Sequence, residues 1–241
     1  MTAPHPQRSP TLAQDGYCIL PGLIDEAWRL ALLARLDGLI AEEGPRAGLE
    51  VHQEVGTNRL ANLVDKGPVF DPLWTHPAVH ACVAGVLGRP FKLSSLNARE
   101  PQPGMGHQGL HADWGPRVPT EPFHVVNSLW VLDGMDSSNG ATRLVPGSHL
   151  VAGSVADHVA DQAAAHPRQV VLDVPPGTVV VFNAHAWHGG TVNASGARRR
   201  VIHGYFTAAE HPGQSDFTTS LSPATRARLS ADHLRMLGVT G

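Results

Sequence analysis

The chain has 241 residues, of which 42% are hydrophobic and 16% charged, enough apolar material for a core and too little charge for a disordered chain. Its 18 basic and 21 acidic residues give a formal charge of −3, which excludes the basic surface that nucleic acid or an anionic membrane requires. No stretch reaches the roughly 20 apolar residues of a membrane helix, and the proline-rich start lacks the apolar segment of a secretory signal.

The composition also predicts the fold class and the compartment. The two cysteines, Cys18 and Cys82, lie far apart in the sequence without metal-ligand spacing, so we expect no disulfide framework and a reducing cytoplasm. The 25 glycines and 20 prolines predict many turns and therefore short strands joined by loops. We find no repeat or linker, and expect one domain over 1–241 with residues 1–14 as a flexible leader.

The N-terminal third predicts one strand and two helices. Residues 17–20 form a short apolar run stopped by Pro21-Gly22, as expected of a strand. An amphipathic helix is expected from an N-cap at Asp25 to Gly44, with one apolar face made of Trp28, Leu32, Leu36 and Leu39. A second helix is expected between Pro77 and Gly88, with one face made of Val79, Val83, Val86 and Leu87.

After Gly88 the pattern changes to short apolar runs separated by turns. The expected strands lie in 91–98, 124–134, 141–147, 168–177, 178–190 and 198–208. This spacing is typical of a barrel or a double-sheet jelly roll. The alanine-rich stretch 153–167 is expected to be an excursion between strands. Residues 222–236 are expected to form one closing helix, capped by Ser222 ahead of Pro223.

The first group of residues with chemical potential is His111-Ala112-Asp113. In an extended segment, residues i and i+2 project from the same face, so the imidazole and the carboxylate can converge on one ion. With a third histidine they would form the two-histidine, one-carboxylate triad of non-haem Fe(II) enzymes, which leaves open positions on the metal. Taken alone, His-x-Asp is a weak signal, and a solvated turn is the alternative.

A candidate third ligand follows the apolar strand that ends at Phe182. In Trp187-His188-Gly189-Gly190 a histidine leads from the strand into a glycine turn, which suits a ligand at the mouth of a barrel. His185, three residues earlier, competes for this role. For either histidine taken singly, a position at the end of a strand or in an exposed loop explains the residue as well as a ligand role does.

The third group is the arginine run that precedes the last expected strand. An arginine inside an apolar strand is costly unless it meets an anion, and its planar fork suits a carboxylate. Strand alternation places Arg199 on the face of Val201 and His203, opposite to Arg198 and Arg200. One of the three arginines is therefore expected to point inward, and the other two to be solvated.

The order and spacing of these groups resemble the phytanoyl-CoA dioxygenase family of Fe(II)- and 2-oxoglutarate-dependent oxygenases. His188 follows His111 by 77 positions and Arg199 follows His188 by 11. Further blocks that resemble the family, in its order and over about residues 15–210, are Asn58-Arg59-Leu60, 66–70, 125–133, 139–142, Val145-Pro146-Gly147-Ser148-His149 and 187–195. We expect Pro146–His149 to form a tight turn that shapes the barrel rim.

The resemblance implies a mainly β protein, a double-stranded β-helix (cupin-like jelly roll) flanked by helices. It implies that His111, Asp113 and His188 bind Fe(II), and that Arg199 pairs with the far carboxylate of 2-oxoglutarate. Asn127 stands where the family contacts this co-substrate, and Thr142 is a weaker candidate for the same task. Dioxygen would be the second co-substrate.

The resemblance further implies a hydroxylation with release of succinate and CO2. Desaturation, ring closure or epimerisation are possible variants. Because related halogenases replace the carboxylate ligand with a small residue, Asp113 favours oxygenation. The expected substrate is a small metabolite or natural-product intermediate, contacted by Trp114 and Arg117 at the pocket entrance; a solvent-exposed Arg117 is the alternative. Arg59 and Lys66 are candidates for binding substrate or co-substrate.

Two alternatives remain open on the sequence alone. One is a cupin-like metalloenzyme that uses the same ligands without 2-oxoglutarate, against which the spacing of Arg199 speaks. The other is a jelly-roll binding protein that has lost turnover, against which the complete ligand set speaks. No nucleic-acid or membrane partner is expected, and the sequence does not indicate the oligomeric state.

Overall fold

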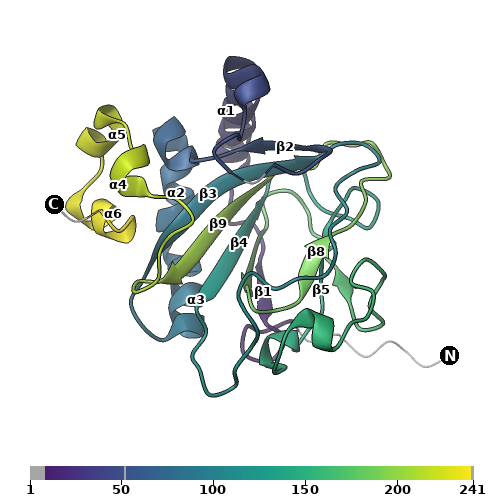
Figure 1. Ribbon diagram of the computed structural model, residues 1–241. Helices are drawn as coiled ribbons and strands as arrows, with labels where there is room; N and C mark the ends of the chain where they lie inside the picture. The colour runs from purple at the N-terminus through teal and green to yellow at the C-terminus, as the bar shows by residue number, and fades with distance from the viewer. Residues whose placement is uncertain (1–8, 52, 240–241) are drawn as a thin grey trace.

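Two antiparallel sheets face each other in the computed structural model, which describes residues 9–51 and 53–239 (Figure 1). The large sheet has the strand order β1-β7-β4-β9-β3-β2, with bounds β1 Tyr17–Leu20, β2 Thr57–Leu60, β3 Phe91–Pro101, β4 Val125–Val131, β7 Val179–Asn183 and β9 Val201–Ala208. The small sheet has the order β6-β5-β8, with bounds β5 Thr142–Leu144, β6 Val170–Val171 and β8 His188–Gly190. The expected double-stranded β-helix is therefore confirmed.

Helices cover the face of the large sheet that points away from the small one (Figure 1). Three come before β3, namely α1 Glu26–Glu43, α2 Asp71–Thr75 and α3 Pro77–Leu87, and three follow β9, namely α4 Phe217–Ser220, α5 Pro223–Arg228 and α6 Ala231–Met236. Short 3-10 turns lie at Gly44–Arg46, Leu63–Lys66, Pro68–Phe70, Ser148–Leu150 and Val155–Asp157. Among the described residues, no helix has the length and apolarity needed to cross a membrane.

The pleat of the large sheet separates two apolar cores, one on each face of the sheet. Residues such as Trp130 and Phe206 point to the helices and join the larger core, whereas Leu129 and Tyr205 belong to the core between the two sheets. Residues directly opposite each other in an antiparallel pair share a face. The register Asn127↔Tyr205 therefore places the inward side chains of neighbouring strands together, and the polar ones among them build the site.

The expected helix boundaries in the N-terminal third are confirmed. The carboxylate of Asp25 accepts the Trp28 N–H at 2.8 Å, which caps α1, and Gly44 ends that helix at φ 51°, in the left-handed region that glycine tolerates. Gly88 ends α3 in the same way at φ 62°. The six expected strand regions each contain a strand, and 178–190 contains two, β7 and β8.

The prediction of one closing helix is wrong. Ser222 caps α5 as expected, but the chain becomes extended at Leu229, which is buried in the larger core, and Ser230 starts α6 by accepting the His233 N–H. A second N-cap and a buried extended residue thus divide the segment. The expectation of a flexible leader falls partly on residues 1–8, which lie outside the described residues, whereas 11–15 form a hydrogen-bonded turn.

Candidate metal centre and its cavity

His111 and His188 are brought together by a β-bridge between the segment before Asp113 and strand β8. The main-chain N–H of each residue donates to the carbonyl of the other at 2.9 Å. Their rings lie 4.4 Å apart between centroids. Two histidines separated by 77 positions are thus fixed by backbone hydrogen bonds rather than by loops.

Asp113 completes a group of three potential ligands, whose nearest nitrogen and oxygen atoms all lie within 4.8 Å of one another. One carboxylate oxygen lies 3.7 Å from Nε2 of His111, and the other lies 3.6 Å from Nε2 of His188. The carboxylate therefore faces both imidazoles. Two imidazoles and one carboxylate around one point form the donor set that suits a non-haem ferrous ion.

The second nitrogen of each imidazole fixes its tautomer. Nδ1 of His111 lies 2.9 Å from the Gly109 carbonyl, and Nδ1 of His188 lies 2.9 Å from the Ala186 carbonyl. A carbonyl can only accept, so both Nδ1 atoms must donate, and in the neutral rings the Nε2 lone pairs face Asp113. Burial lowers the pKa of His188 and favours its neutral form, against the opposing effect of Asp113. The arrangement matches the outer-shell support typical of metal-bound histidines.

His185, which the sequence left as a competitor of His188, does not belong to this group. Its Nε2 accepts the main-chain N–H of His124 at 3.1 Å. Burial, followed by the charges of His124 and Arg117, lowers its pKa to about 3, so the ring is neutral. His185 therefore supports the loop that carries His124.

The two glycines after His188 allow a close approach of the chain before His111. A Cβ atom at Gly189 would lie 2.7 Å from the carbonyl oxygen of Gln108, and one at Gly190 would lie 2.6 Å from that of Gly106. Both neighbours are backbone atoms that cannot rotate away. The glycine pair is thus a packing requirement of the bridge that joins the two histidines.

Two hydroxyl groups hold the ligand-bearing segments from outside. Ser148 Oγ accepts the Trp187 N–H at 2.8 Å and donates to the Val145 carbonyl at 2.6 Å, which ties the Pro146–His149 turn to the residue before His188. The Tyr205 hydroxyl donates to the Asp113 carbonyl at 2.9 Å. The expectation of a turn is confirmed by Gly147, which adopts φ 77° before a 3-10 turn.

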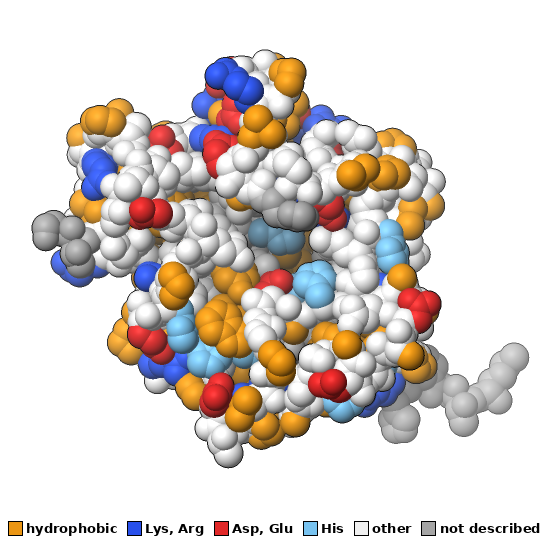
Figure 2. All heavy atoms as spheres, in the orientation of Figure 1, with side chains coloured by type: hydrophobic (Ala, Val, Ile, Leu, Met, Phe, Trp, Pro, Cys, Tyr) orange, Lys and Arg blue, Asp and Glu red, His pale blue; other side chains and the backbone are white. Residues whose placement is uncertain are grey.

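A cavity of about 190 Å³ opens beside the three ligands, and Figure 2 shows it as a hollow in the exposed face with histidine and acidic side chains at its wall. The predicted residues that line it are His111, Asp113, His188, Asn127, Thr142 and Arg59. Asn127 and Thr142 are both buried. Within the described part of the chain, Asn127 Oδ1 has no hydrogen-bond partner.

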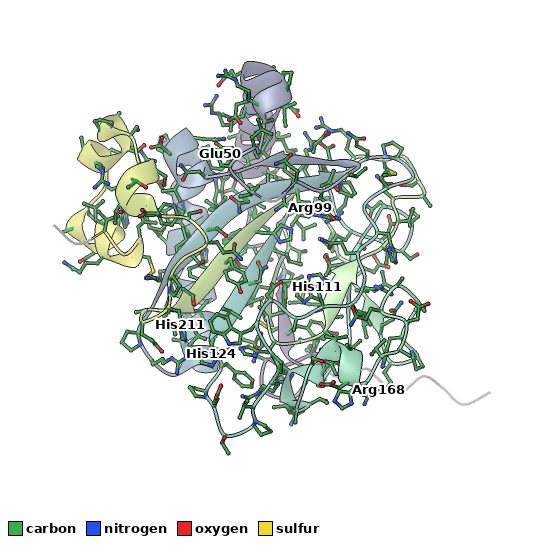
Figure 3. All side chains as sticks on the ribbon, viewed as in Figure 1. Glu50, Arg99, His111, His124, Arg168 and His211 are labelled. Atoms are coloured by element: carbon green, nitrogen blue, oxygen red, sulfur yellow. The ribbon has the colours of Figure 1, made fainter. Side chains whose placement is uncertain are left out.

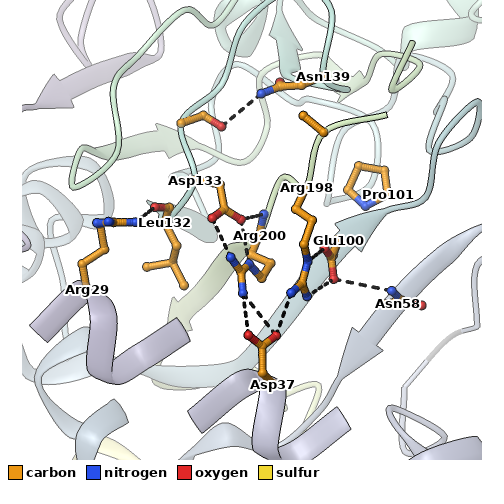
Figure 4. Close-up of polar contacts among 12 residues, drawn as sticks. Arg29, Asp37, Asn58, Glu100, Pro101, Leu132, Asp133, Asn139, Arg198 and Arg200 are labelled. Atoms are coloured by element: carbon orange, nitrogen blue, oxygen red, sulfur yellow. Dashed lines mark hydrogen bonds and ion pairs between the residues drawn. The ribbon is translucent and has the colours of Figure 1, made fainter. Parts of the chain in front are cut away.

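The three consecutive arginines separate as strand alternation predicts. Arg198 and Arg200 share Asp37 on the outside of the sheet, and each has a second carboxylate, Glu100 for Arg198 and Asp133 for Arg200 (Figure 4). The expectation that these two are solvated holds for Arg198, whose side chain is 50% exposed, and is wrong for Arg200, which is 13% exposed; both link α1 to the sheet. Arg199 points the other way and is 1% exposed.

Arg199 is a buried cation with unmet hydrogen-bonding capacity. Its Nε and Nη2 have no partner among the described residues. Burial, followed by the charge of Arg99, lowers its pKa to about 9. Arg199 is not among the side chains that line the cavity, but its charge acts on His203, which does line it.

Sequence reasoning missed a charged cluster at the far end of the cavity. Arg59 and Arg99 stand directly opposite each other on β2 and β3 and both line the cavity. Glu54 contacts Arg99 at 2.6 and 2.9 Å and Arg59 at 3.4 Å. In Figure 3, Arg99 lies above His111 on the same open face. The inward face of β3 continues with Asn97, and the opposite position on β9 is His203.

The other predicted substrate residues lie elsewhere. Trp114 and Arg117 line a second pocket of about 200 Å³, which meets the first at His111. Arg117 is half-buried rather than exposed; it donates to main-chain carbonyls, including that of Glu121 at 2.8 Å, and lies 4.6 Å from the Phe123 ring centroid. Lys66 pairs with Glu43 at 2.6 Å and does not line the cavity.

Comparisons with known proteins identify a family and several similar proteins. The family model described as phytanoyl-CoA dioxygenase matches residues 12–201. Dioxygenase trt7 of Aspergillus terreus is 29% identical over 215 residues, which cover 82% of this chain and 73% of that protein. Dioxygenase cdmA of Talaromyces verruculosus is 27% identical over 209 residues, covering 79% and 68%.

Solved structures share the fold at low sequence identity. HygX from Streptomyces hygroscopicus, solved with nickel and 2-oxoglutarate, superposes with a TM-score of 0.70 at 16% identity over 89% of this chain and 91% of that chain. The epimerase SnoN, solved with Fe3+, α-ketoglutarate and nogalamycin RO, gives 0.68 at 19% identity over 92% and 94%. The described fold is thus one that holds a metal ion and 2-oxoglutarate in other proteins.

Proposed function

The chain belongs to the phytanoyl-CoA dioxygenase family of iron- and 2-oxoglutarate-dependent dioxygenases, and we propose that His111, Asp113 and His188 hold its ferrous ion. The observation that carries this proposal is the convergence of their ligand atoms within 4.8 Å. The Nδ1 hydrogen bonds, which leave both Nε2 lone pairs directed at the same point, support it. Iron bound there supplies the activation of dioxygen that oxidises a substrate C–H bond as 2-oxoglutarate is converted to succinate and CO2.

Arg199 is proposed to bind the carboxylate of 2-oxoglutarate that lies away from the metal. A buried guanidinium without a counter-ion is strongly destabilising, whereas a planar carboxylate would satisfy two of its N–H groups at once. The two unpartnered nitrogens of Arg199 fit such a ligand. Although burial lowers its pKa, a value of about 9 keeps the side chain charged at neutral pH.

Other cavity residues are proposed to orient the small molecules. Asn127 and Thr142 present polar groups on the inner wall, within reach of the co-substrate. Arg59 shares Glu54 with Arg99 and keeps an Nε without a partner among the described residues, so it can bind a further anionic or polar group of substrate or co-substrate. Trp114 and Arg117 would contact the substrate only where it extends past His111 into the second pocket.

The proposed reaction is the hydroxylation, or a related oxidation, of a small natural-product intermediate. The structural neighbours that hold hygromycin B or nogalamycin RO support this substrate class. The apolar wall that Leu129 and Phe182 give the cavity would exclude water from part of the bound substrate. We further propose that the chain acts as a single catalytic domain, and in the cytoplasm, as its cysteine usage suggests.

The proposal is tested by measuring iron retained after anaerobic loading and gel filtration. The wild-type chain is expected to retain one iron per chain, and the Asp113→Ala variant is expected to lose most or all of its iron. Asp173→Ala is the matched control, because Asp173 is an exposed carboxylate outside the cavity. Equal retention by wild type and Asp113→Ala would contradict the assigned ligand set.

A further inference from the structure

The two cysteines are neighbours in space, although they lie 64 positions apart in the sequence. Cys18 lies on β1, the edge strand of the large sheet, and Cys82 lies in α3. Their sulfur atoms are 3.7 Å apart, which is van der Waals contact between two thiols. Both cysteines are free thiols, and their contact is not visible in the sequence.

The contact is held by two elements with independent supports. β1 pairs with β7 in a register that places Cys18 opposite Val181, and α3 packs Val79, Val83 and Leu87 into the core on the same side of the sheet. Both thiols are half-buried. Neither sulfur depends on a loop for its position, so the pair is preorganised.

Cys82 can be reached from outside through a cavity. This cavity measures about 560 Å³ and is bordered by Cys82, Leu12, Val86, Phe123 and His149. Cys18 is not among its lining residues. Of the two half-buried thiols, Cys82 is the one that borders this cavity, which suits it to attack first and leaves Cys18 as the resolving thiol.

We propose that Cys18 and Cys82 form a redox modification site that a low-molecular-weight disulfide converts to an intramolecular disulfide between β1 and α3. The Cys82 thiolate attacks one sulfur of the small disulfide, which forms a mixed disulfide and releases one small thiolate. Cys18 loses its proton to solvent and attacks the Cys82 sulfur, which releases the second small thiolate. Two protein thiols are oxidised, and one small disulfide is reduced to two thiols.

The hydrogen bond within the pair prepares the first step. When Cys82 is ionised, the Cys18 thiol can donate to it, and this contact lowers the pKa of Cys82 while burial acts in the opposite direction. The same contact, together with burial, raises the pKa of Cys18. Because the thiolate is the nucleophile, the first attack falls to the sulfur that borders the cavity.

The disulfide would also change the stability of the fold. It would close a loop from Cys18 to Cys82 that contains α1, β2 and α2 and would restrict the unfolded chain. It would bind the edge strand β1 covalently to the helical layer. β1 pairs with β7, which carries the cavity residue Phe182. The disulfide would therefore restrain one wall of the candidate metal site.

The experiment equilibrates the iron-loaded, full-length chain under argon with glutathione disulfide and reduced glutathione at increasing ratios. Free thiols are then blocked in acid and the intact mass is measured. Wild type is expected to pass from two free thiols to none, with loss of two hydrogen atoms and no retained glutathione, and dithiothreitol should reverse this. The oxidised form should unfold at a temperature higher by about 5 °C or more.

Single substitutions separate the steps. Cys18→Ser is expected to stop as a glutathione adduct on Cys82, and Cys82→Ser is expected to react far more slowly. A wild-type chain that keeps both thiols in glutathione disulfide alone, that accumulates a stable adduct, or that cross-links only between chains would overturn the proposal. None of these results depends on turnover, so the proposal stands or fails separately from the assigned oxygenase site.

Discussion

At the scale of single residues, Arg199 shows how an unfavourable buried charge indicates a ligand. A guanidinium that is 1% exposed has lost its hydration, and two of its nitrogens find no compensating partner among the described residues. Such a residue destabilises the protein without its ligand. The proposed binding of a 2-oxoglutarate carboxylate would supply the counter-ion that this buried guanidinium lacks.

Replacing Arg199 with lysine is expected to raise the KM for 2-oxoglutarate about 10- to 100-fold, because an ammonium group cannot form the bidentate pair. The measurement is succinate release as a function of 2-oxoglutarate concentration. Arg198→Lys is the matched control, because the Arg198 guanidinium binds Asp37 and Glu100 on the outer side of the sheet. The KM of this variant for 2-oxoglutarate should stay within about twofold of the wild-type value. Equal effects of both substitutions would contradict the assignment.

The residues of the candidate site were predictable only in part. His111, Asp113, His188 and Arg199 could be identified because their order and spacing resemble those of the phytanoyl-CoA dioxygenase family, whereas each motif taken alone is a weak signal. The cluster of Glu54, Arg59 and Arg99 was not predicted as a unit, since it depends on which strands become neighbours. The pairing of β2 with β3 alone places Arg59 opposite Arg99, and no local pattern encodes that pairing.

At the scale of elements, strand β8 depends on its glycines to hold both histidines. Gly189→Ala would place a Cβ within 3 Å of two backbone carbonyls, those of Gln108 and Gly109. The segment that carries His111 would have to move away from His188. We expect Fe(II) affinity to fall about tenfold or more, the effect typical of disturbing the support of a ligand, measured by anaerobic titration.

Gly85→Ala is the matched control for that prediction. Gly85 lies within α3, and a Cβ there would meet no atom within 4 Å. Alanine in a helix is favoured over glycine, so the free energy of unfolding should rise by about 0.5–1 kcal/mol with no change in iron affinity. Loss of iron affinity in Gly85→Ala as well, or full affinity in Gly189→Ala, would contradict the packing argument.

Elements with strong local signals were predicted with correct boundaries, and the others were not. The caps of α1 and α3 involve residues that are near in sequence, so Asp25, Gly44 and Gly88 could be identified. The division of the closing helix into α5 and α6 depends on Leu229 being drawn into the larger core. That is a tertiary contact, and the continuous helical pattern of 222–236 does not reveal it.

At the scale of the whole molecule, the two apolar cores explain why the site tolerates so many polar groups. The larger core between the sheet and the helices contains most of the buried aliphatic and aromatic side chains. The core between the sheets can therefore accommodate Asn127, His203 and Arg199. The strand and turn pattern of the sequence predicted the jelly roll. It did not predict which end of the space between the two sheets is apolar and which is polar, because that depends on the strand order.

Buried histidines make the stability of the whole fold sensitive to acid. The pKa values of His185, His149 and His124 lie below the usual 6.5, mainly because of burial, and that of His185 is about 3. These histidines become protonated near pH 6.5 in the unfolded chain, whereas in the folded chain they stay neutral to lower pH. Stability is therefore full above that pH and falls as the pH decreases through 6.5 towards the folded pKa values.

The prediction is that the free energy of unfolding, measured by denaturant titration without added metal, decreases between about pH 7 and pH 5. His185→Gln should reduce that slope by up to about 1.4 kcal/mol per pH unit, the contribution of one linked proton. Depressed carboxylate pKa values, such as that of Asp136, act only at lower pH, so they do not obscure this window. An unchanged slope would show that His185 is not a buried neutral group.

The most direct test of the central claim is an anaerobic titration of the metal-free chain with Fe(II) and then 2-oxoglutarate. The signal is the weak visible charge-transfer band of a keto acid chelated to ferrous iron. The account predicts a band that saturates at one iron per chain, is lost in His111→Ala, and is retained in His107→Ala, in which an exposed histidine outside the ligand group is removed. An undiminished band in His111→Ala, or iron that binds to wild type without any band, would contradict it.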